Sequence, residues 1–289
     1  MFEGMIAGWK AAGETRRLVF KDKQLFAYPI IGAIAAMVEF VVMLLLFVLA
    51  GSASGGPALG TVVPLFVLFY IVAGFTSTYT IMAMFVAFRS FAGVGGRGKR
   101  ISIAKAFSAV KPYSILILEW SIFYTVIIMI IRLLESRLRG ISGALLGGVI
   151  SLAVTVVTLF VVPIILDDKV GPLEAMKRSE QMIVKHFGST FAGLAYSDLY
   201  GLAITVLGIV VFVAGVLLGL PVLSLLIMAA GGMLIVFGVL LSYILSNTFK
   251  LILYDYVKSG RLPQGFDKNI MKSVARYKNS GRAYPGSFA

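Results

Sequence analysis

Residues 28–50 read YPIIGAIAAMVEFVVMLLLFVLA, an apolar run with one charged side chain, Glu39. About 20 apolar residues in a helix cross the hydrocarbon core of a bilayer, so this stretch predicts a transmembrane helix. Five more runs of the same kind follow along the chain. The sequence therefore predicts six spans, at residues 28–50, 61–88, 113–134, 142–166, 191–218 and 221–249.

The composition also indicates a membrane protein. Of the 289 residues, 59% are hydrophobic and 13% are charged, whereas a soluble domain has about 45–50% apolar and about 25% charged residues. The chain has no cysteine and one histidine, which excludes disulfides, thiolate catalysis and iron–sulfur clusters and removes most zinc chemistry. The sequence also lacks an HExxH motif and a nucleophile elbow. We expect no catalytic residue, no metal and no cofactor.

Basic residues lie almost entirely in alternate loops and at the two ends. Of the 26 Lys and Arg residues, all but Arg132, Arg137 and Arg139 precede the first span or fall in the second loop, the fourth loop or the tail. Positively charged loops stay in the cytosol, so both termini are predicted to be cytosolic, in a plasma membrane. The net charge of +13 could suggest nucleic acid, but this distribution indicates anionic lipid headgroups. The candidate headgroup-facing residues are Arg89, Arg97, Lys99, Arg100, Lys169 and Lys250.

This topology divides the chain into three parts. Residues 1–27 form an amphipathic segment in which Phe2, Met5, Ile6 and Trp9 recur at helical spacing. Such a helix lies in the headgroup region, so we expect it to anchor the chain at the cytosolic surface. Residues 28–253 form the transmembrane domain, and residues 254–289 form a basic cytosolic tail.

Two series of residues recur with a period of about 80. The carboxylates Glu39, Glu119 and Asp198 stand inside three apolar runs, and Arg89, Lys169 and Lys250 stand at the inner ends of the even-numbered spans. A shared period indicates copies of one unit. The fold predicted is an all-α membrane bundle of six helices, built from three repeated hairpins. Each hairpin would follow a cytosolic amphipathic helix.

Several segments resemble a known kind of membrane protein. These are FVVPIILDDKVGPLEAMKRS at residues 160–179, the tail LILYDYVKSGRLPQGFD at residues 251–267, and an N-terminal pattern that includes Trp9, Asp22-Lys23 and Pro29. They are similar to six-span prokaryotic membrane families of unknown function. A more distant resemblance is to the membrane domain of glycerophosphodiester phosphodiesterases. The resemblance implies a fold and no activity, and the catalytic domain of those enzymes has no counterpart here.

The three intramembrane carboxylates are the main candidate functional residues. A charged carboxylate at the centre of a helix costs about 2.5–3.5 kcal/mol on insertion scales, so each needs a compensating role. Acids inside a membrane commonly carry protons or cations. Alternatively, Glu39, Glu119 and Asp198 hold the bundle together through interhelical hydrogen bonds to hydroxyl groups. Their recurrence in three units favours the structural interpretation, because a fold-specifying contact would be copied with its unit.

Two other motifs are weaker. Residues 93–99, GVGGRGK, match the spacing of phosphate-binding loops, but such a loop needs a preceding strand and a following Ser or Thr. We interpret this segment as a basic loop. Asp167 and Asp168 resemble part of a metal–diphosphate site, but no second acidic cluster follows, so we expect them to cap and solvate a helix end.

Three classes of function follow from these features. We favour a non-catalytic membrane protein that acts as a scaffold, a lipid-interacting protein or an assembly subunit, either as a homo-oligomer or with another membrane protein. The alternative is a carboxylate-dependent transporter or channel for protons, cations or a solute. An intramembrane enzyme ranks third.

Overall fold

A computed structural model of the chain describes residues 2–53, 59–94, 98–137, 141–218 and 220–275. About 90% of the described residues are helical, and these ranges contain no strand. The elements in chain order are α1 (Phe2–Lys21), η1 (Lys23–Phe26), α2 (Ala27–Ala53), α3 (Leu59–Ala92), α4 (Ile103–Val110), η2 (Lys111–Tyr113), α5 (Ser114–Arg137), α6 (Ile141–Val157), α7 (Val161–Asp168), α8 (Pro172–Leu217), α9 (Pro221–Ser259) and α10 (Lys268–Ala275).

Six stretches of helix are long and apolar enough to cross a membrane, which confirms the predicted all-α membrane fold. They are Lys23–Gly51, Gly60–Ala92, Ile103–Arg137, Gly147–Asp168, Leu194–Leu217 and Val222–Ser259. Some helices are much longer than a span needs. At 1.5 Å per residue, the 39 residues of α9 extend about 58 Å, so this helix continues beyond the hydrocarbon.

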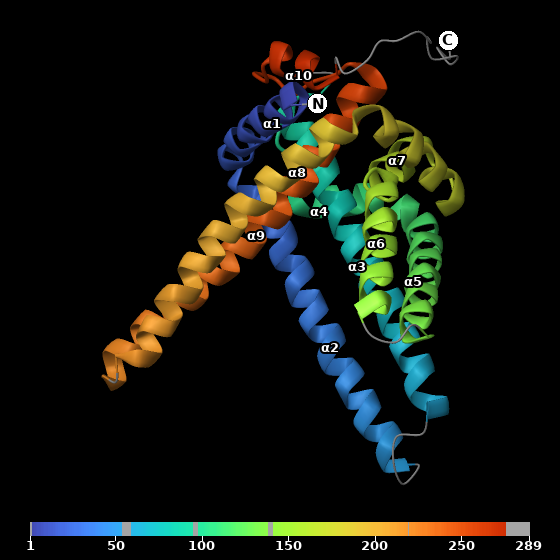
Figure 1. Ribbon diagram of the computed structural model, residues 1–289, viewed down its shortest axis with the longest axis vertical. Helices are drawn as coiled ribbons and strands as arrows, with labels where there is room; N and C mark the ends of the chain where they lie inside the picture. Colours follow the sequence, from blue (N-terminus) through green and yellow to red (C-terminus); the bar gives the residue numbers. More distant parts are fainter. Residues whose placement is uncertain (1, 54–58, 95–97, 138–140, 219, 276–289) are drawn as a thin grey trace.

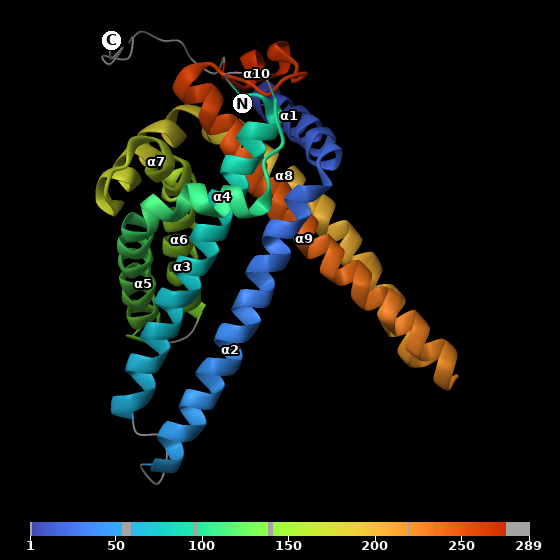
Figure 2. The same ribbon diagram turned by 180° about the vertical axis from the view of Figure 1, so that it is seen from behind.

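The six spans form three antiparallel hairpins that meet at one end and diverge at the other (Figure 1). The end where they meet, which we call the junction, also carries α1, α4 and α10 (Figures 1 and 2). Hairpin α8–α9 leaves the junction at a wide angle to α2 and to the group α3, α5 and α6. The first and last described helices, α1 and α10, therefore lie at the same end of the bundle, and the cytosolic placement of the two termini stays a prediction.

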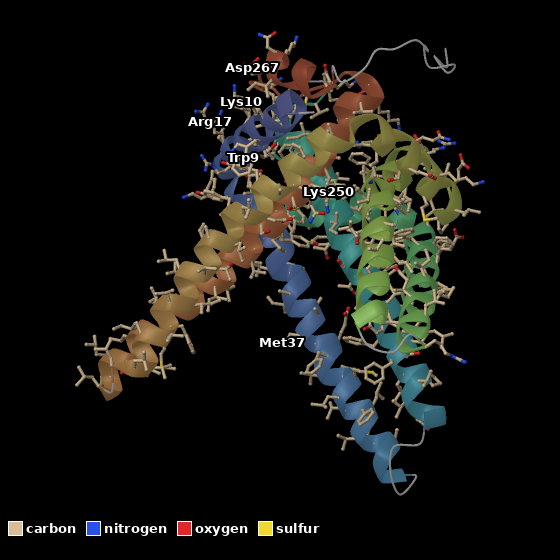
Figure 3. The ribbon with its side chains drawn as sticks, viewed as in Figure 1. Trp9, Lys10, Arg17, Met37, Lys250 and Asp267 are labelled. Atoms are coloured by element: carbon tan, nitrogen blue, oxygen red, sulfur yellow. The ribbon has the colours of Figure 1, made fainter. Side chains whose placement is uncertain are left out.

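The hydrophobic core lies at the junction. Large side chains with 0–1% exposure include Tyr28, Phe88, Ile165, Phe249 and Tyr254, which come from all three hairpins. Away from the junction the helices expose long apolar faces instead. Met37 on α2 is 70% exposed and lies beyond the region where the helices converge (Figure 3). The hairpins are therefore joined at one end of the helix bundle and contact each other little along the rest of their length.

The fourth span is interrupted between α6 and α7, a break that the single predicted run at 142–166 did not include. The turn falls at residues 158–160, just before Pro163. Proline has no N–H, and its ring clashes with the carbonyl four residues earlier. Helix α6 therefore ends, and α7 restarts with Pro163 in its first turn, where a missing N–H is tolerated.

Two of the three predicted amphipathic segments form separate helices, α1 and α4. The third does not, because α8 runs without a break from Pro172 into the fifth span. Helix α1 buries Ala11, Ala12 and Val19 against the protein, while Ile6 and Trp9 remain 48% and 45% exposed. The side chains of Phe2 and Met5 lie outside the described part of the chain. Helix α9 continues to Ser259, past residue 254 where the tail was expected to begin.

Candidate functional site

The junction is closed by a group of alternating charges, which we call the ion cluster: Arg89, Asp167, Asp168, Arg178, Asp255 and Lys258. Arg89 ends α3 and donates hydrogen bonds to Asp255 on α9 and Asp167 on α7. Lys258 binds both Asp167 and Asp168. The guanidinium of Arg178 lies 2.8 Å from Asp168, and hydrogen bonds to Glu174 and Asp168 raise the pKa of Arg178. The ion cluster therefore links all three hairpins.

Beneath the ion cluster lies a cavity of about 280 Å³, which we call the Lys250 cavity. Its walls come from α3, α5, α9 and the break between α6 and α7. Apolar and polar side chains both line it, and those with a polar group are Ser77, Thr78, Trp120, Ser121, Tyr124, Thr155, Thr158, Asn247 and Lys250. Lys250 is partly buried and lies where the helices converge (Figure 3).

Glu39 lies in a second cavity, of about 270 Å³, between α2, α3 and α9. The hydroxyl of Thr76 on α3 donates a hydrogen bond to its Oε1. Its Oε2 is buried and has no hydrogen-bond partner among the described residues. Ser77 lines both this cavity and the Lys250 cavity, and it interacts with the Tyr243 hydroxyl. The two cavities therefore have Ser77 in common as a lining residue.

Asp198 on α8 makes a similar contact within its own hairpin. Ser242 and Ser246 on α9 donate hydrogen bonds to its Oδ1, at 2.9 and 2.7 Å. Asp198 is nevertheless exposed. It lies in a groove of about 720 Å³ on the α8–α9 hairpin, which we call the Asp198 groove. Small residues contribute much of its lining, which is Ala195, Asp198, Leu199, Gly201, Leu202, Thr205, Val239, Ser242 and Tyr243.

Glu119, the third predicted carboxylate, has a different environment. It is exposed near the start of α5 and makes no hydrogen bond or ion pair with any residue that the structure describes. Its carboxylate lies close to Gly171, where an added Cβ would be 4.0 Å from Oε2 of Glu119. Glu39 and Asp198 thus share a bonding pattern that Glu119 lacks, and the predicted threefold repeat stays a prediction.

The six basic residues predicted to face headgroups also differ in environment. Lys99, Arg100 and Lys169 are exposed, and Arg100 donates to the Lys21 carbonyl and pairs with Asp22. Arg89 is engaged in the ion cluster, and Lys250 lines a cavity between helices. Arg97 lies outside the described residues.

Sequence reasoning missed the ion cluster, the Lys250 cavity and the break in the fourth span. One signal was present for each of the last two. Asn247 and Lys250, which both line the Lys250 cavity, stand three residues apart and so share one helix face, and Pro163 stands inside an apolar run. No sequence signal paired Arg89 with Asp255, because their contact depends on how separate helices pack. Within the described ranges, no three His, Cys, Asp or Glu side chains are placed to hold a metal ion.

The model of a family of unknown function, DUF6159, matches residues 58–265, which include all helices from α3 to α9. No curated protein and no solved structure gives a match.

Proposed function

The chain belongs to the family of unknown function DUF6159, and from that premise and its own geometry we propose that it is a non-catalytic subunit of a membrane assembly. The expectation of an uncharacterised family is confirmed in this form. The more distant resemblance to the membrane domain of glycerophosphodiester phosphodiesterases stays a prediction. In the assembly, the α8–α9 hairpin binds a transmembrane helix of another membrane protein along the Asp198 groove.

The exposure of Asp198 carries this proposal. Hydrocarbon is a costly environment for an acid, so transmembrane Asp residues almost always face protein or a water-filled cavity. In the isolated chain, Asp198 is exposed four residues into the span that begins at Leu194, and it lines an open groove. A helix packed in that groove would cover the carboxylate. A partner helix with a hydroxyl, amide or basic side chain at this level would also donate a hydrogen bond to it.

The groove has the properties of a helix-packing surface. Transmembrane helices associate through small residues that allow close approach, and Ala195 and Thr205 supply them here. The remaining edge is apolar, with Leu202 53% exposed. Two copies that met groove to groove would bring their Asp198 carboxylates together, so a different chain with a donor suits this surface better.

The two helices of the hairpin pack closely on each other. Glycines at positions 201, 208 and 215 recur every seven residues along α8 and face α9, where Gly231 and Gly238 have the same spacing. A Cβ at Gly208 would lie 2.6 Å from the backbone nitrogen of Ile235. The two backbones are therefore in close contact, and residues of α8 and α9 alone form the Asp198 groove.

Filling the groove tests the proposal. The full chain is extracted from its native membrane in mild detergent, and the mass of the complex is measured by light scattering. Wild type should exceed the mass of one chain, whereas Leu202→Trp should reduce the complex toward a single chain. Leu45→Trp, at a 57% exposed site on α2, should leave the mass unchanged. A wild type that is monomeric, or equal masses for the two variants, would reject the proposal.

One observation favours transport as a second candidate. Transporter sites often form where a span is broken and polar side chains converge, and the break between α6 and α7 opens on the Lys250 cavity. Through Ser77 this cavity adjoins the one that holds Glu39. A carboxylate-dependent proton pathway would use these groups, and flux in proteoliposomes tests it.

A further inference from the structure

We propose that the Lys250 cavity binds a phosphate group, either as the headgroup of a lipid or as free inorganic phosphate. This site is separate from the Asp198 groove and does not depend on the proposed assembly. The argument rests on an unpaired cation, on free hydrogen-bond donors, and on the helix end that meets them.

The first observation is the unpaired charge of Lys250. Arg89, Arg178 and Lys258 each bind carboxylates in the ion cluster. Lys250 forms no salt bridge or hydrogen bond with any described residue, and the cavity lining contains no acid. The charge of Asp198 acts on Lys250 from a distance, but that carboxylate is bound by two serines. An uncompensated ammonium between helices is costly, and an anion in the cavity would pair with it.

The second observation concerns the hydrogen-bond donors in the wall. Ser121, Thr155 and Thr158 donate their hydroxyl protons to carbonyls of their own helices. Trp120 and Tyr124 also line the cavity, and neither side chain hydrogen-bonds to a described residue. An indole N–H can only donate. Three groups, the Lys250 ammonium, the Trp120 indole and the Tyr124 hydroxyl, therefore offer donors to one space.

The third observation is the helix end at the cavity wall. Thr158, Leu159 and Val162 all line the cavity, so the first turn of the eight-residue helix α7 adjoins it. The N-terminus of a helix carries partial positive charge, which attracts anions. The N–H of Val161 bonds to the Thr158 carbonyl and Pro163 has no N–H, so this end acts on the cavity through its partial charge. This end and Lys250 act in the same direction.

The size of the cavity suits the ligand. A water molecule occupies about 30 Å³ in the liquid, so about 280 Å³ holds a small anion with some water. Lysine is a common ligand of phosphate, which it binds as a point charge. Free phosphate and a lipid phosphate share this chemistry, and their different solubility lets an experiment separate them.

Direct binding measurements test the proposal on the full chain in detergent. Inorganic phosphate and a short-chain phosphatidic acid are titrated separately, with a short-chain diacylglycerol as the uncharged control. At least one of the two phosphates should bind, and the diacylglycerol should not. Binding of inorganic phosphate identifies free phosphate as a ligand, and binding of phosphatidic acid alone identifies a lipid. Absence of binding by both would overturn the proposal.

The variant Lys250→Met removes the charge and keeps an unbranched chain. Because a charge-assisted hydrogen bond contributes about 1.5–3 kcal/mol, affinity should fall roughly tenfold to a hundredfold. Lys105→Met, at an exposed lysine on α4, is the matched control and should bind like wild type. Without ligand, Lys250→Met should unfold at or above the wild-type temperature, because it removes an unpaired charge. Equal affinity in Lys250→Met and wild type would contradict the proposed site.

A spectroscopic measurement covers the case in which Lys250→Met does not fold. The chain has two tryptophans, Trp9 and Trp120, so Trp9→Phe leaves Trp120 as the only indole fluorophore. Phosphate in the cavity should shift the Trp120 emission with the same concentration dependence as binding. Binding that leaves this emission unchanged would place the anion elsewhere and reject the Lys250 cavity as its site.

Discussion

Arg89 and Asp255 are joined side by side: the Nε of Arg89 donates to Oδ2 of Asp255 at 3.1 Å, and Nη2 donates to Oδ1. Arg89 lies near the C-terminal end of α3 and Asp255 near that of α9. The two helices belong to different hairpins. The same guanidinium also binds Asp167 at the end of α7. One arginine therefore connects the returning helices of all three hairpins at the junction.

Replacing Arg89 should loosen the junction. The Asp255 side chain is 7% exposed, so Arg89→Met leaves a buried carboxylate without its partner. Breaking a buried pair on one side costs about 3 kcal/mol or more, and thermal unfolding should show the loss. The double variant Arg89→Met, Asp255→Leu should recover most of it, because neither charge remains. Arg132→Ala, which removes an exposed pair with Glu135, is the control. A double variant no more stable than Arg89→Met would contradict the pairing.

Replacement by alanine should change the stability of the protein much more at Gly231 than at its neighbour Gly232 on α9. A Cβ at Gly231 would lie 2.7 Å from the Cα of Phe212 on α8, whereas a Cβ at Gly232 would meet nothing within 4 Å. Gly231→Ala should force the hairpin apart and cost about 2 kcal/mol, as overpacking does. Gly232→Ala should change stability by less than about 1 kcal/mol. Thermal unfolding compares them, and equal effects would argue against close packing of α8 on α9.

The six spans could be predicted because length and hydrophobicity are local properties of the chain. A run such as residues 28–50 is too apolar to remain in water, so it is expected to enter the bilayer whatever segments flank it. The arrangement of the spans could not be predicted in the same way. Arg89 and Lys250 both carry a positive charge and stand at similar positions near the ends of spans. Arg89 nevertheless binds two carboxylates, whereas Lys250 lines a cavity. That difference depends on the rotation and depth of each helix against the others.

The surroundings of the candidate carboxylates depend on helix packing in the same way. Glu39 and Asp198 accept hydrogen bonds from hydroxyls on the returning helix. Glu119 accepts none from the described residues, although its sequence spacing is the same, and the roles of the three acids stay predictions. Continuity was also hard to predict: α8 runs through a polar segment into its span, and the fourth span breaks near Pro163. In each case local packing decides between alternatives that the sequence leaves open.

Cysteine labelling can determine the orientation of the chain in the membrane. The protein has no native cysteine, so single substitutions give unambiguous labelling. Lys105 on α4 and Arg137 at the end of α5 are both exposed and lie toward opposite ends of the molecule. The excess of basic loops predicts that Lys105→Cys faces the cytosol and Arg137→Cys faces outward. A membrane-impermeant maleimide added to intact cells should label only Arg137→Cys. Labelling of Lys105→Cys alone would show that the orientation is opposite to the predicted one. Labelling of both variants would reject the six-span topology.

Glu39 separates the two candidate functions. Its Oε1 accepts a hydrogen bond from Thr76, and glutamine keeps an oxygen that can accept the same bond. Glu39→Gln should therefore fold and assemble like wild type if the carboxylate serves only to hold α2 against α3. Glu39→Leu removes the acceptor and should cost about 1–2 kcal/mol, the range for interhelical hydrogen bonds in lipid.

An amide cannot release a proton, so transport through Glu39 would be lost in Glu39→Gln even though the fold is kept. We expect no proton or cation flux from either protein in proteoliposomes, because both intramembrane acids that contact a neighbouring helix are bound by hydroxyls of their own hairpin. Empty liposomes give the leak rate, and an added protonophore shows that a gradient was present. Robust flux in wild type that Glu39→Gln abolishes would overturn the assembly function in favour of transport.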